Sequence, residues 1–311
     1  MGEQAIKFLV VGIDKCEKKI PWAYKILKFF HKNPYDIRGI QKLIYHKDEI
    51  VIMNKHGLLI ELPFTQEEIS TIPPEYLEAY IHKILEVYDI PNCYLRRELK
   101  RLNDRFDMNK KWIFQYLLFD KGIDLFFEKY NIQKKDAKFV IIDSGNKRVE
   151  LILQVILEYA NYVTIVTNRQ MYFAKAVEVV YEETGLLMDV VSSYTQKNIT
   201  GNVVINLDKD CYGIYNNFEE NAFVIDLQFT DKKLEYLSNR RRDLTILYDY
   251  DILVDKKELE KELVAEVMVR DNWKLSRFSK RNDGALTINE IRNIVEYYKL
   301  EIKKLNTIST R

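Results

Sequence analysis

Two short polar turns in the middle of the chain contain residue types that suit phosphate binding. Ser144-Gly145-Asn146 follows the apolar run Lys138–Asp143, and Asn168-Arg169 follows the β-branched run Tyr162–Thr167. Glycine has no Cβ, so the backbone can approach a phosphate that lies at the positive end of the next helix. After the second strand, an arginine accommodates a ribose 2′-phosphate, whereas an acidic residue suits the free 2′-hydroxyl. We therefore expect a cofactor-binding site made of Ser144, Gly145, Asn146, Asn168 and Arg169.

Each turn also has a simpler interpretation. The first contains a single glycine, whereas the turn of a dinucleotide-binding protein is rich in glycine. Lys147 and Arg148 follow at the predicted helix start, where cations oppose the helix dipole unless an anion is bound. The alternative is a tight strand-to-helix turn with two solvated cations. For Arg169 the alternative is a surface turn with one exposed arginine.

The two turns are positioned by short apolar strands that alternate with helices. The expected strands are Lys138–Asp143, Tyr162–Thr167, Leu186–Val191, Val203–Leu207, Phe223–Leu227 and Leu244–Leu247. This alternation is typical of a parallel sheet that is covered on both faces. Because crossover connections are right-handed, the simplest topology is the doubly wound one. The fold class is therefore α/β with a Rossmann-like parallel sheet.

The amino-terminal part reads as a mixed α/β domain. A strand is expected at Ile6–Ile13, and a hairpin is expected around Asn54-Lys55-His56-Gly57. Two other amino-terminal elements complete this set, a helix that carries Trp22 to Phe30 and a strand at Gln41–Tyr45. A capping box at Thr65–Glu68 and an amphipathic helix after Pro73-Pro74 follow. Tyr94–Tyr130 has a helical pattern with a break near Gly122.

The carboxy-terminal part returns to helices. A capping box at Thr287–Glu290 begins a last helix, whose apolar residues continue to Ile302 and Leu305, and which we expect to pack back on the protein. The segment Ser276–Gly284 is the most loop-like. We expect two domains: residues 1–120 form the amino-terminal α/β domain, and residues 121–311 form the Rossmann-like domain with a linking helix and carboxy-terminal helices.

The segment Tyr162–Val180 resembles the strand, Asn-Arg turn and helix of shikimate dehydrogenases and glutamyl-tRNA reductases. The helix Lys121–Asn131, which leads into the strand at Lys138, also lies where the inter-domain helix of those families would be. The resemblance covers roughly a third of the chain. It implies a Rossmann domain that binds NADP, with Asn168 and Arg169 at the positions that meet the adenosine 2′-phosphate.

The chain departs from these families in three respects. The glycine-rich turn is reduced to Ser144-Gly145-Asn146, and neither the Lys/Asp catalytic pair nor the catalytic cysteine of the reductases can be matched. Catalytic residues are therefore unassigned. Two functions remain: an NADP-dependent oxidoreductase, or a non-catalytic descendant without cofactor that binds a ligand or a protein. A methyltransferase is disfavoured, because that class needs an acidic residue where Asn168 stands.

Composition excludes several other classes. With 48 basic and 47 acidic residues, the chain has no global field that would attract nucleic acid. It has neither a secretory leader nor an apolar run of the ~18–20 residues that span a bilayer, so we expect a cytoplasmic protein without membrane contact. The histidines and the three cysteines lack metal-ligand spacing, and we assign no metal site. Asp249, Asp251 and Asp255, as well as Asn239–Arg242, read as solvated groups at element ends.

Overall fold

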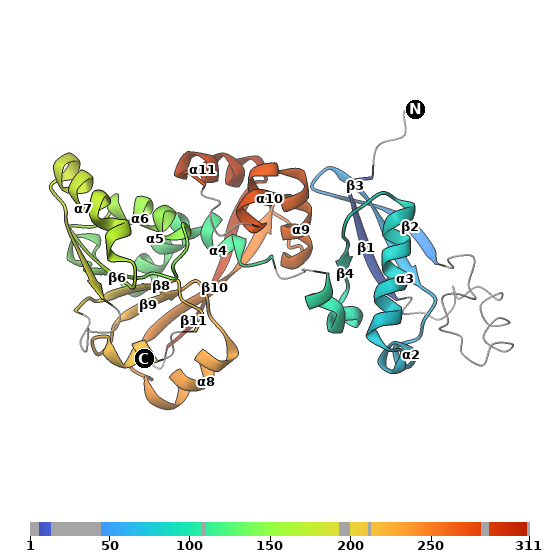
Figure 1. Ribbon diagram of the computed structural model, residues 1–311, viewed down its shortest axis with the longest axis horizontal. Coiled ribbons are helices and arrows are strands. Elements are labelled where there is room, and N and C mark those ends of the chain that lie inside the picture. Colours follow the sequence, from blue (N-terminus) through green and yellow to red (C-terminus); the bar gives the residue numbers. More distant parts are fainter. Residues whose placement is uncertain are drawn as a thin grey trace, which may run out of the picture. The chain divides into compact units, whose positions relative to one another are not determined.

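The computed structural model describes residues 6–13, 45–106, 110–192, 200–210, 213–280 and 286–309. The chain divides into two compact units, Met1–Lys111 with Glu260–Ser276, and Trp112–Leu259 with Arg277–Arg311 (Figure 1). The boundary expected near residue 120 stays a prediction. Two elements expected from the sequence, the helix from Trp22 to Phe30 and most of the strand Gln41–Tyr45, lie outside the described residues.

The first unit contains a four-stranded sheet with the order β2-β3-β1-β4. Its strands are β1 (Phe8–Ile13), β2 (His46–Ile52), β3 (Lys55–Leu62) and β4 (Tyr94–Leu95). Strand β1 pairs in parallel with β3 and β4, and β2 pairs with β3 in antiparallel fashion. The β2–β3 hairpin closes through Met53 and Asn54, which both have positive φ. The expected hairpin is therefore present, but its turn is Met53-Asn54, and Lys55, His56 and Gly57 of the predicted turn belong to β3.

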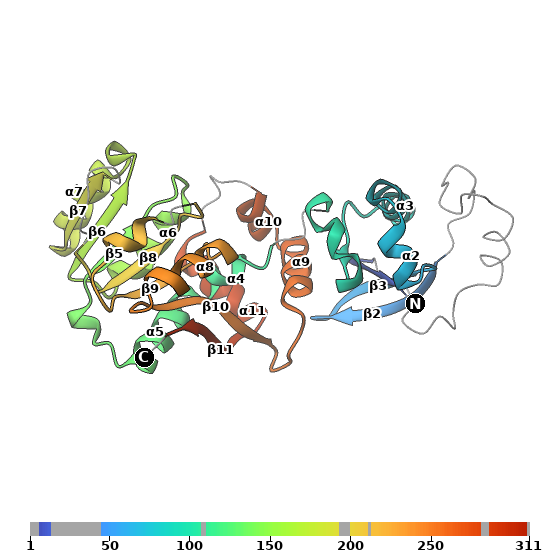
Figure 2. The same ribbon diagram turned by 90° about the horizontal axis from the view of Figure 1, so that it is seen from below.

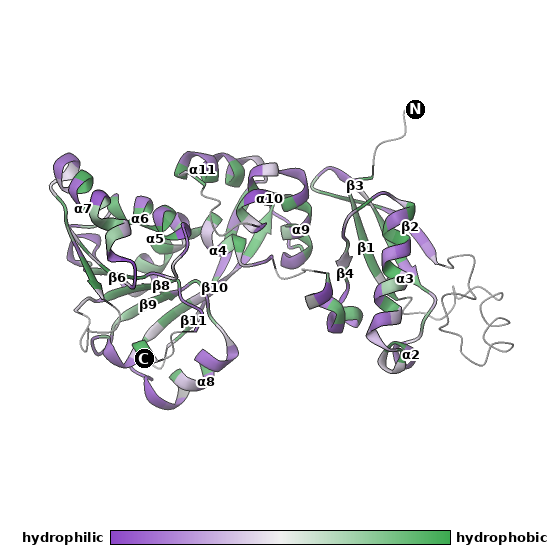
Figure 3. Cartoon of the chain, in the orientation of Figure 1, coloured by the Kyte–Doolittle hydropathy of each residue, from purple (hydrophilic) through white to green (hydrophobic). Residues whose placement is uncertain are grey.

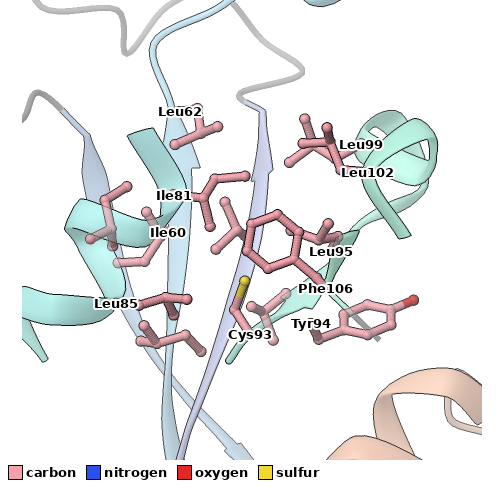
Figure 4. Packing of buried hydrophobic residues seen from close by; sticks show 14 of the residues in the cluster. Ile60, Leu62, Ile81, Leu85, Cys93, Tyr94, Leu95, Leu99, Leu102 and Phe106 are labelled. Atoms are coloured by element: carbon pink, nitrogen blue, oxygen red, sulfur yellow. The ribbon is translucent and has the colours of Figure 1, made fainter. Parts of the chain in front are cut away.

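Helices cover this sheet and share its core with the strands. They are α2 (Gln66–Thr71), α3 (Pro74–Val87), a 3-10 helix at Arg97–Arg105, and α9 (Lys261–Asp271) from the distant carboxy-terminal part. Thr65 and Glu68 form the capping box that the sequence predicts. Figure 4 shows how Ile81 and Leu85 of α3 meet Ile60 of β3 and Cys93 in one apolar cluster.

The second unit contains a seven-stranded sheet with the order β11-β10-β9-β8-β5-β6-β7. The strands are β5 (Phe139–Ile142), β6 (Tyr162–Thr167), β7 (Leu187–Ser192), β8 (Val203–Asn206), β9 (Phe223–Asp226), β10 (Thr245–Val254) and β11 (Leu300–Ile308). All neighbours pair in parallel except β10 and β11. From β7 to β10 this is the strand order of the Rossmann fold, which winds outward from the centre in two halves. In the second half, a 3-10 helix stands between β8 and β9 in place of an α-helix. The predicted doubly wound sheet is confirmed.

The helices of the second unit are α4 (Ile113–Leu117), α5 (Phe119–Tyr130), α6 (Arg148–Leu157), α7 (Gln170–Thr184), α8 (Asp231–Arg240) and α11 (Ile288–Tyr297). Helix α10 (Trp273–Lys280) spans the division between the units. Short 3-10 helices lie at Lys134–Asp136 and Gly213–Asn217. Figures 1 and 2 draw α6 and α7 on one face of the sheet and α8 on the other. The strands between them are coloured mainly as hydrophobic in Figure 3, as a sheet covered on both faces requires.

Three expectations about elements are wrong in part. The last helix begins at its capping box and packs on α4 and α6, but it ends at Tyr297, and Leu300–Ile308 forms strand β11. In that strand Ile302 and Leu305 pair with residues of β10. Gly122 does not break a helix, since α5 runs through it and the Tyr250 ring packs against its Cα. Of the segment Ser276–Gly284, expected to be loop-like, Ser276–Lys280 is helical, and residues 281–284 lie outside the described residues. Among the described residues, no helix is long and apolar enough to cross a membrane.

Candidate functional site

The carboxyl ends of β5 and β8 are the natural place for a ligand in this sheet. These two strands are neighbours, yet the chain continues from β5 toward β6 on one side and from β8 toward β9 on the other. The loops that follow them therefore diverge. In open α/β sheets, ligands bind outside the carboxyl ends of the strands at such a switch point. The predicted residues Ser144, Gly145 and Asn146 lie in the loop after β5.

Asp143 organises this loop. Its side chain is 1% exposed, and its carboxylate accepts hydrogen bonds from the Gly145 amide (3.0 Å) and from Thr167 Oγ1 (2.7 Å) at the end of β6. Arg169 Nε (2.8 Å) and Nη2 (3.0 Å) donate to the two oxygens of the same carboxylate. This forked ion pair is a strong and directional interaction. The end of β5 is thereby fixed to the end of β6.

The loop also satisfies some of its own backbone amides. Gly145 has φ +82°, a left-handed conformation that favours glycine, and a Cβ there would meet open space. Asn146 Oδ1 accepts from the Arg148 amide (2.9 Å), and Asn146 Nδ2 donates to Ser144 Oγ (2.7 Å). The Gly145 and Arg148 amides therefore already have partners. A phosphate at the start of α6 would find fewer free amides than a glycine-rich loop offers.

One donor group of Arg169 makes no hydrogen bond to the described residues. Besides its contacts with Asp143, its Nη2 donates to the Asn146 carbonyl (2.6 Å), and its guanidinium lies 4.0 Å from the centre of the Tyr172 ring. Nη1 donates to none of the described residues, and the side chain is 26% exposed. The hydrogen bonds to Asp143 raise the pKa of Arg169 above its ordinary value. Burial, together with a hydrogen bond to Glu150, raises the pKa of Tyr172 to about 12.

The structure brings four of the five predicted residues together. Ser144, Gly145, Asn146 and Arg169 belong to one hydrogen-bonded network around Asp143. Asn168 is exposed at the end of β6, next to Arg169. Their assignment to a cofactor stays a prediction.

A second polar cluster at the same edge of the sheet escaped the sequence analysis. Asn206 ends β8, Asp226 ends β9, Tyr215 comes from the 3-10 helix between them, and Lys233 lies in α8; all four side chains are buried. Lys233 Nζ donates to both Asp226 oxygens (3.1 and 3.0 Å) and to the Asp208 carbonyl (2.6 Å). Tyr215 and Asn206 (3.2 Å) also donate to Asp226. Every polar atom of the Asp226 carboxylate therefore has partners inside the protein.

A signal for this cluster was present in the sequence. Val-Val-Ile-Asn206 and Phe-Val-Ile-Asp226 are apolar runs that end in a polar residue, as Phe-Val-Ile-Ile-Asp143 does. Because carboxyl ends of parallel strands meet at one edge, the three polar residues had to lie near each other. Nothing in the sequence indicates that Lys233 turns inward, because it follows two other charged residues, Asp231 and Lys232.

Two other features of the described residues involve none of the side chains described above. An apolar cavity of about 340 Å³ in the second unit is lined by residues such as Leu117, Val155 and Ile291, and by none of the five predicted residues.

In the first unit, His46, Asp48 and Glu61 have ligand atoms within 4.8 Å of one another. His46 Nε2 already contacts Asp48 (3.2 Å), and Arg96 Nη1 lies 3.9 Å from Glu61. A cation would have to compete with that arginine.

The fold and this edge define a two-unit α/β protein with a Rossmann-type sheet. No protein-family model and no curated protein matches the chain. Solved structures do match at low identity, and they include shikimate and quinate dehydrogenases and related enzymes.

Shikimate dehydrogenase 1 from Peptoclostridium difficile is 12% identical, with 93% of this chain and 98% of that chain covered and a TM-score of 0.31. Shikimate 5-dehydrogenase from Listeria monocytogenes is 9% identical, with 95% and 97% covered and a TM-score of 0.33. Quinate dehydrogenase from Corynebacterium glutamicum is 8% identical, with 94% and 99% covered and a TM-score of 0.32. TM-scores in this range carry no weight for function, so the proposals below rest on the contacts of this chain.

Proposed function

We propose that the second unit binds a phosphate-bearing nucleotide at the carboxyl ends of β5 and β6, and that NADP is the ligand with the best fit. The observation that carries this proposal is Arg169. It lies at the end of β6, beside the loop that precedes α6, and its Nη1 donates to none of the described residues. An arginine at this place in a Rossmann sheet accommodates a ribose 2′-phosphate.

The ion pair with Asp143 is compatible with this role. It uses Nε and Nη2, so it fixes the guanidinium plane and leaves the Nη1 end for a ligand. A donor that is already oriented loses less conformational entropy when it binds. The Tyr172 ring supports one face of the guanidinium. Oxidoreductase activity would follow from NADP binding only together with a catalytic group, and none is assigned.

A second candidate function, a binding module without cofactor, has its own support. The Gly145 and Arg148 amides are bonded within the loop, and Lys233 ties α8 to the ends of β8 and β9. A dinucleotide extends across the switch point between β5 and β8. If the second half of this path is closed, the chain binds a mononucleotide or none.

The test is thermal unfolding with NADPH, NADH and S-adenosylmethionine. At 100 times its dissociation constant, a ligand adds roughly 2.7 kcal/mol to the free energy of unfolding. We expect NADPH to raise Tm more than NADH, and we expect Arg169→Ala to remove that preference. Arg240→Ala is the matched control, because Arg240 is exposed and also lies over a tyrosine ring, Tyr236.

The outcomes separate the candidates. If none of the three compounds changes Tm at millimolar concentration, the nucleotide proposal fails and the cofactor-free module stands. If NADPH stabilises the protein and Arg169→Ala keeps the full preference over NADH, Arg169 does not contact the 2′-phosphate. Arg169→Lys keeps the charge without the fork, and it serves where the alanine variant does not fold.

A further inference from the structure

Arg148 is a half-buried cation without a counter-charge among the described residues. Arg169, Arg241 and Arg270 each pair with a carboxylate in the same structure. Arg148 forms no ion pair with a carboxylate of the described residues, and its Nε is buried without a hydrogen-bond partner among them. A buried N–H group without an acceptor is unfavourable, and more so when it carries charge.

Three aromatic rings surround this guanidinium. Its carbon lies 3.9 Å from the centre of the Trp112 ring, 5.4 Å from that of Phe278 and 5.8 Å from that of Tyr116. The rings also contact one another, with centres 5.6 to 5.8 Å apart. Attraction between a cation and a ring stabilises the charge over the ring face. It provides no acceptor for the Nε–H group at the edge of the guanidinium.

A second polar group next to Arg148 also lacks a partner. The Tyr116 side chain is 1% exposed, and its buried hydroxyl makes no hydrogen bond to the described residues. Burial raises the pKa of Tyr116, while Gln228 and Arg148 lie near enough to oppose that change. Burial lowers the pKa of Arg148, and the nearby Tyr116 oxygen opposes that change. The buried Nε of Arg148 and the buried hydroxyl of Tyr116 therefore belong to neighbouring side chains, one of which is charged.

The position in the fold favours an anion at this place. Arg148 is the first residue of α6, a helix of ten residues that begins after the carboxyl end of β5. Gln228 follows the carboxyl end of β9. The positive end of the helix dipole therefore adds to the charge of the guanidinium at the ligand-binding edge of the sheet.

We propose that Arg148 binds the oxyanion of a small ligand, a carboxylate or a phosphate, and that Tyr116 is a second donor to it. The guanidinium edge presents parallel N–H groups that match two oxygens of either anion. The Trp112 ring holds the guanidinium plane in place. This site is distinct from the Arg169 contacts, and it does not depend on the binding of a nucleotide.

The experiment is a titration of the full chain with inorganic phosphate and with benzoate, followed by the arginine Nε–H signals in a ¹H–¹⁵N spectrum. Because its Nε is shielded from water, Arg148 should give a signal, identified by its loss in Arg148→Gln. We expect one of the two anions to shift this signal to saturation. Phosphate alone indicates a phosphorylated ligand, and benzoate alone indicates a carboxylic acid.

Matched variants connect the binding to the named side chains. Charged hydrogen bonds contribute about 1.5–3 kcal/mol, so Arg148→Lys should weaken binding by roughly 10- to 100-fold. Tyr116→Phe should weaken it by up to about tenfold. Arg277→Gln removes an exposed arginine next to Phe278 and should leave the affinity unchanged.

Two results would overturn the site. One is a wild-type Arg148 signal that neither anion shifts, or that drifts without saturation together with all arginine signals. The other is equal affinity, measured by calorimetry, in the wild type, Arg148→Lys and Tyr116→Phe. Neither result bears on the nucleotide proposal, which is tested by the preference for NADPH at Arg169. Conversely, failure of NADPH to bind leaves the anion titration at Arg148 unaffected.

Discussion

Two aspartates at the same edge of the second sheet have opposite relations to solvent. Asp143 ends the run of β5 and pairs with Arg169, whose side chain is 26% exposed. Asp226 ends β9 and pairs with Lys233, and both of these side chains are 0% exposed. The Asp143–Arg169 pair joins the end of β5 to the end of the neighbouring strand β6. The Asp226–Lys233 pair joins β9 to α8, the helix that follows it. Only the first pair leaves a donor, Nη1 of Arg169, for a molecule from solution.

The comparison distinguishes an ion pair that only stabilises the fold from an ion pair that can also bind a ligand. A fully buried ion pair must satisfy all its hydrogen bonds internally, because desolvation of both charges is costly. The Asp226 cluster does so through Tyr215 and Asn206. A half-exposed arginine keeps water as a partner, and a ligand can replace that water. We therefore expect replacement of Lys233 to affect stability, and replacement of Arg169 to affect both stability and binding.

The largest expected effect is that of Lys233→Met. The methionine fills the space of the lysine stem but leaves the Asp226 carboxylate buried without a cation. Removal of one partner from a buried pair costs about 3–5 kcal/mol. Urea unfolding monitored by circular dichroism should show this loss.

Lys232→Met is the control, because Lys232 is the exposed neighbour in the same turn of α8. The double variant Lys233→Met, Asp226→Asn should recover part of the stability, since it removes the unpaired charge. A Lys233→Met protein as stable as Lys232→Met would show that the Asp226 cluster has no structural importance.

Arg169→Ala should have an intermediate effect. It leaves Asp143 with its bonds to Thr167 and Gly145, and water can reach the vacated side. Hydrogen bonds to a charged group contribute about 1.5–3 kcal/mol, so we expect a loss of about 2 kcal/mol in urea unfolding. The double variant with Asp143→Asn should lose little more than either single variant, because the two residues act as one unit. Additive losses would contradict this coupling.

The sequence predicted the central sheet well, because apolar runs of four to six residues between helical segments allow few topologies. It failed at the carboxy terminus, where Ile302 and Leu305 are compatible with the helical spacing of Ile291 to Tyr298. Lys299 has positive φ and ends the helix there. The antiparallel pairing with β10 then selects a strand, and no local pattern contains that partner.

Only the local features of the candidate site could be predicted from the sequence, and its role in binding stays a prediction. Gly145 and Arg169 stand in turns whose residue types indicate phosphate chemistry, and the structure places both beside Asp143. The ion pair between Arg169 and Asp143 joins two strands across 26 residues, and it depends on the pairing of β5 with β6. The inward direction of Lys233 depends likewise on the sheet beneath α8. Spacing in the sequence cannot indicate such contacts.

A smaller effect is expected from Gly145→Ala, which changes the loop around the partly exposed Asp143–Arg169 pair. Space is available for the new Cβ, but φ is +82°, and a residue other than glycine is strained there by about 1 kcal/mol. Gly145→Asn should cost less, because asparagine tolerates this conformation. Thermal unfolding of both variants should show a lower Tm for Gly145→Ala than for Gly145→Asn. If alanine is no worse than asparagine, the loop adopts another conformation in solution.

The smallest effect is expected for Asp243, which supports the buried Asp226 cluster indirectly, through Arg241. Asp243 accepts from Arg241 Nε (2.9 Å) and Nη2 (2.8 Å), and Arg241 Nη1 donates to the carbonyls of Tyr215 and Phe218. This arginine thereby links Asp243 to the 3-10 helix that carries Tyr215. The hydrogen bonds from Arg241 lower the pKa of Asp243 to about 2.

The sign of the pH dependence follows from this lowered pKa. In the unfolded chain an aspartate titrates near pH ~3.9, so its contribution to folding is complete above about pH 4 and disappears as the pH falls toward about 2. Because Asp243 is partly exposed, Asp243→Asn should cost less than about 1 kcal/mol at neutral pH. The difference in unfolding free energy between the wild type and Asp243→Asn should narrow as the pH falls below about 4. A difference that stays constant through this range would mean that Arg241 binds the Tyr215 carbonyl without help from the Asp243 charge. The stability of the buried Asp226 cluster would then not depend on the ionisation of Asp243.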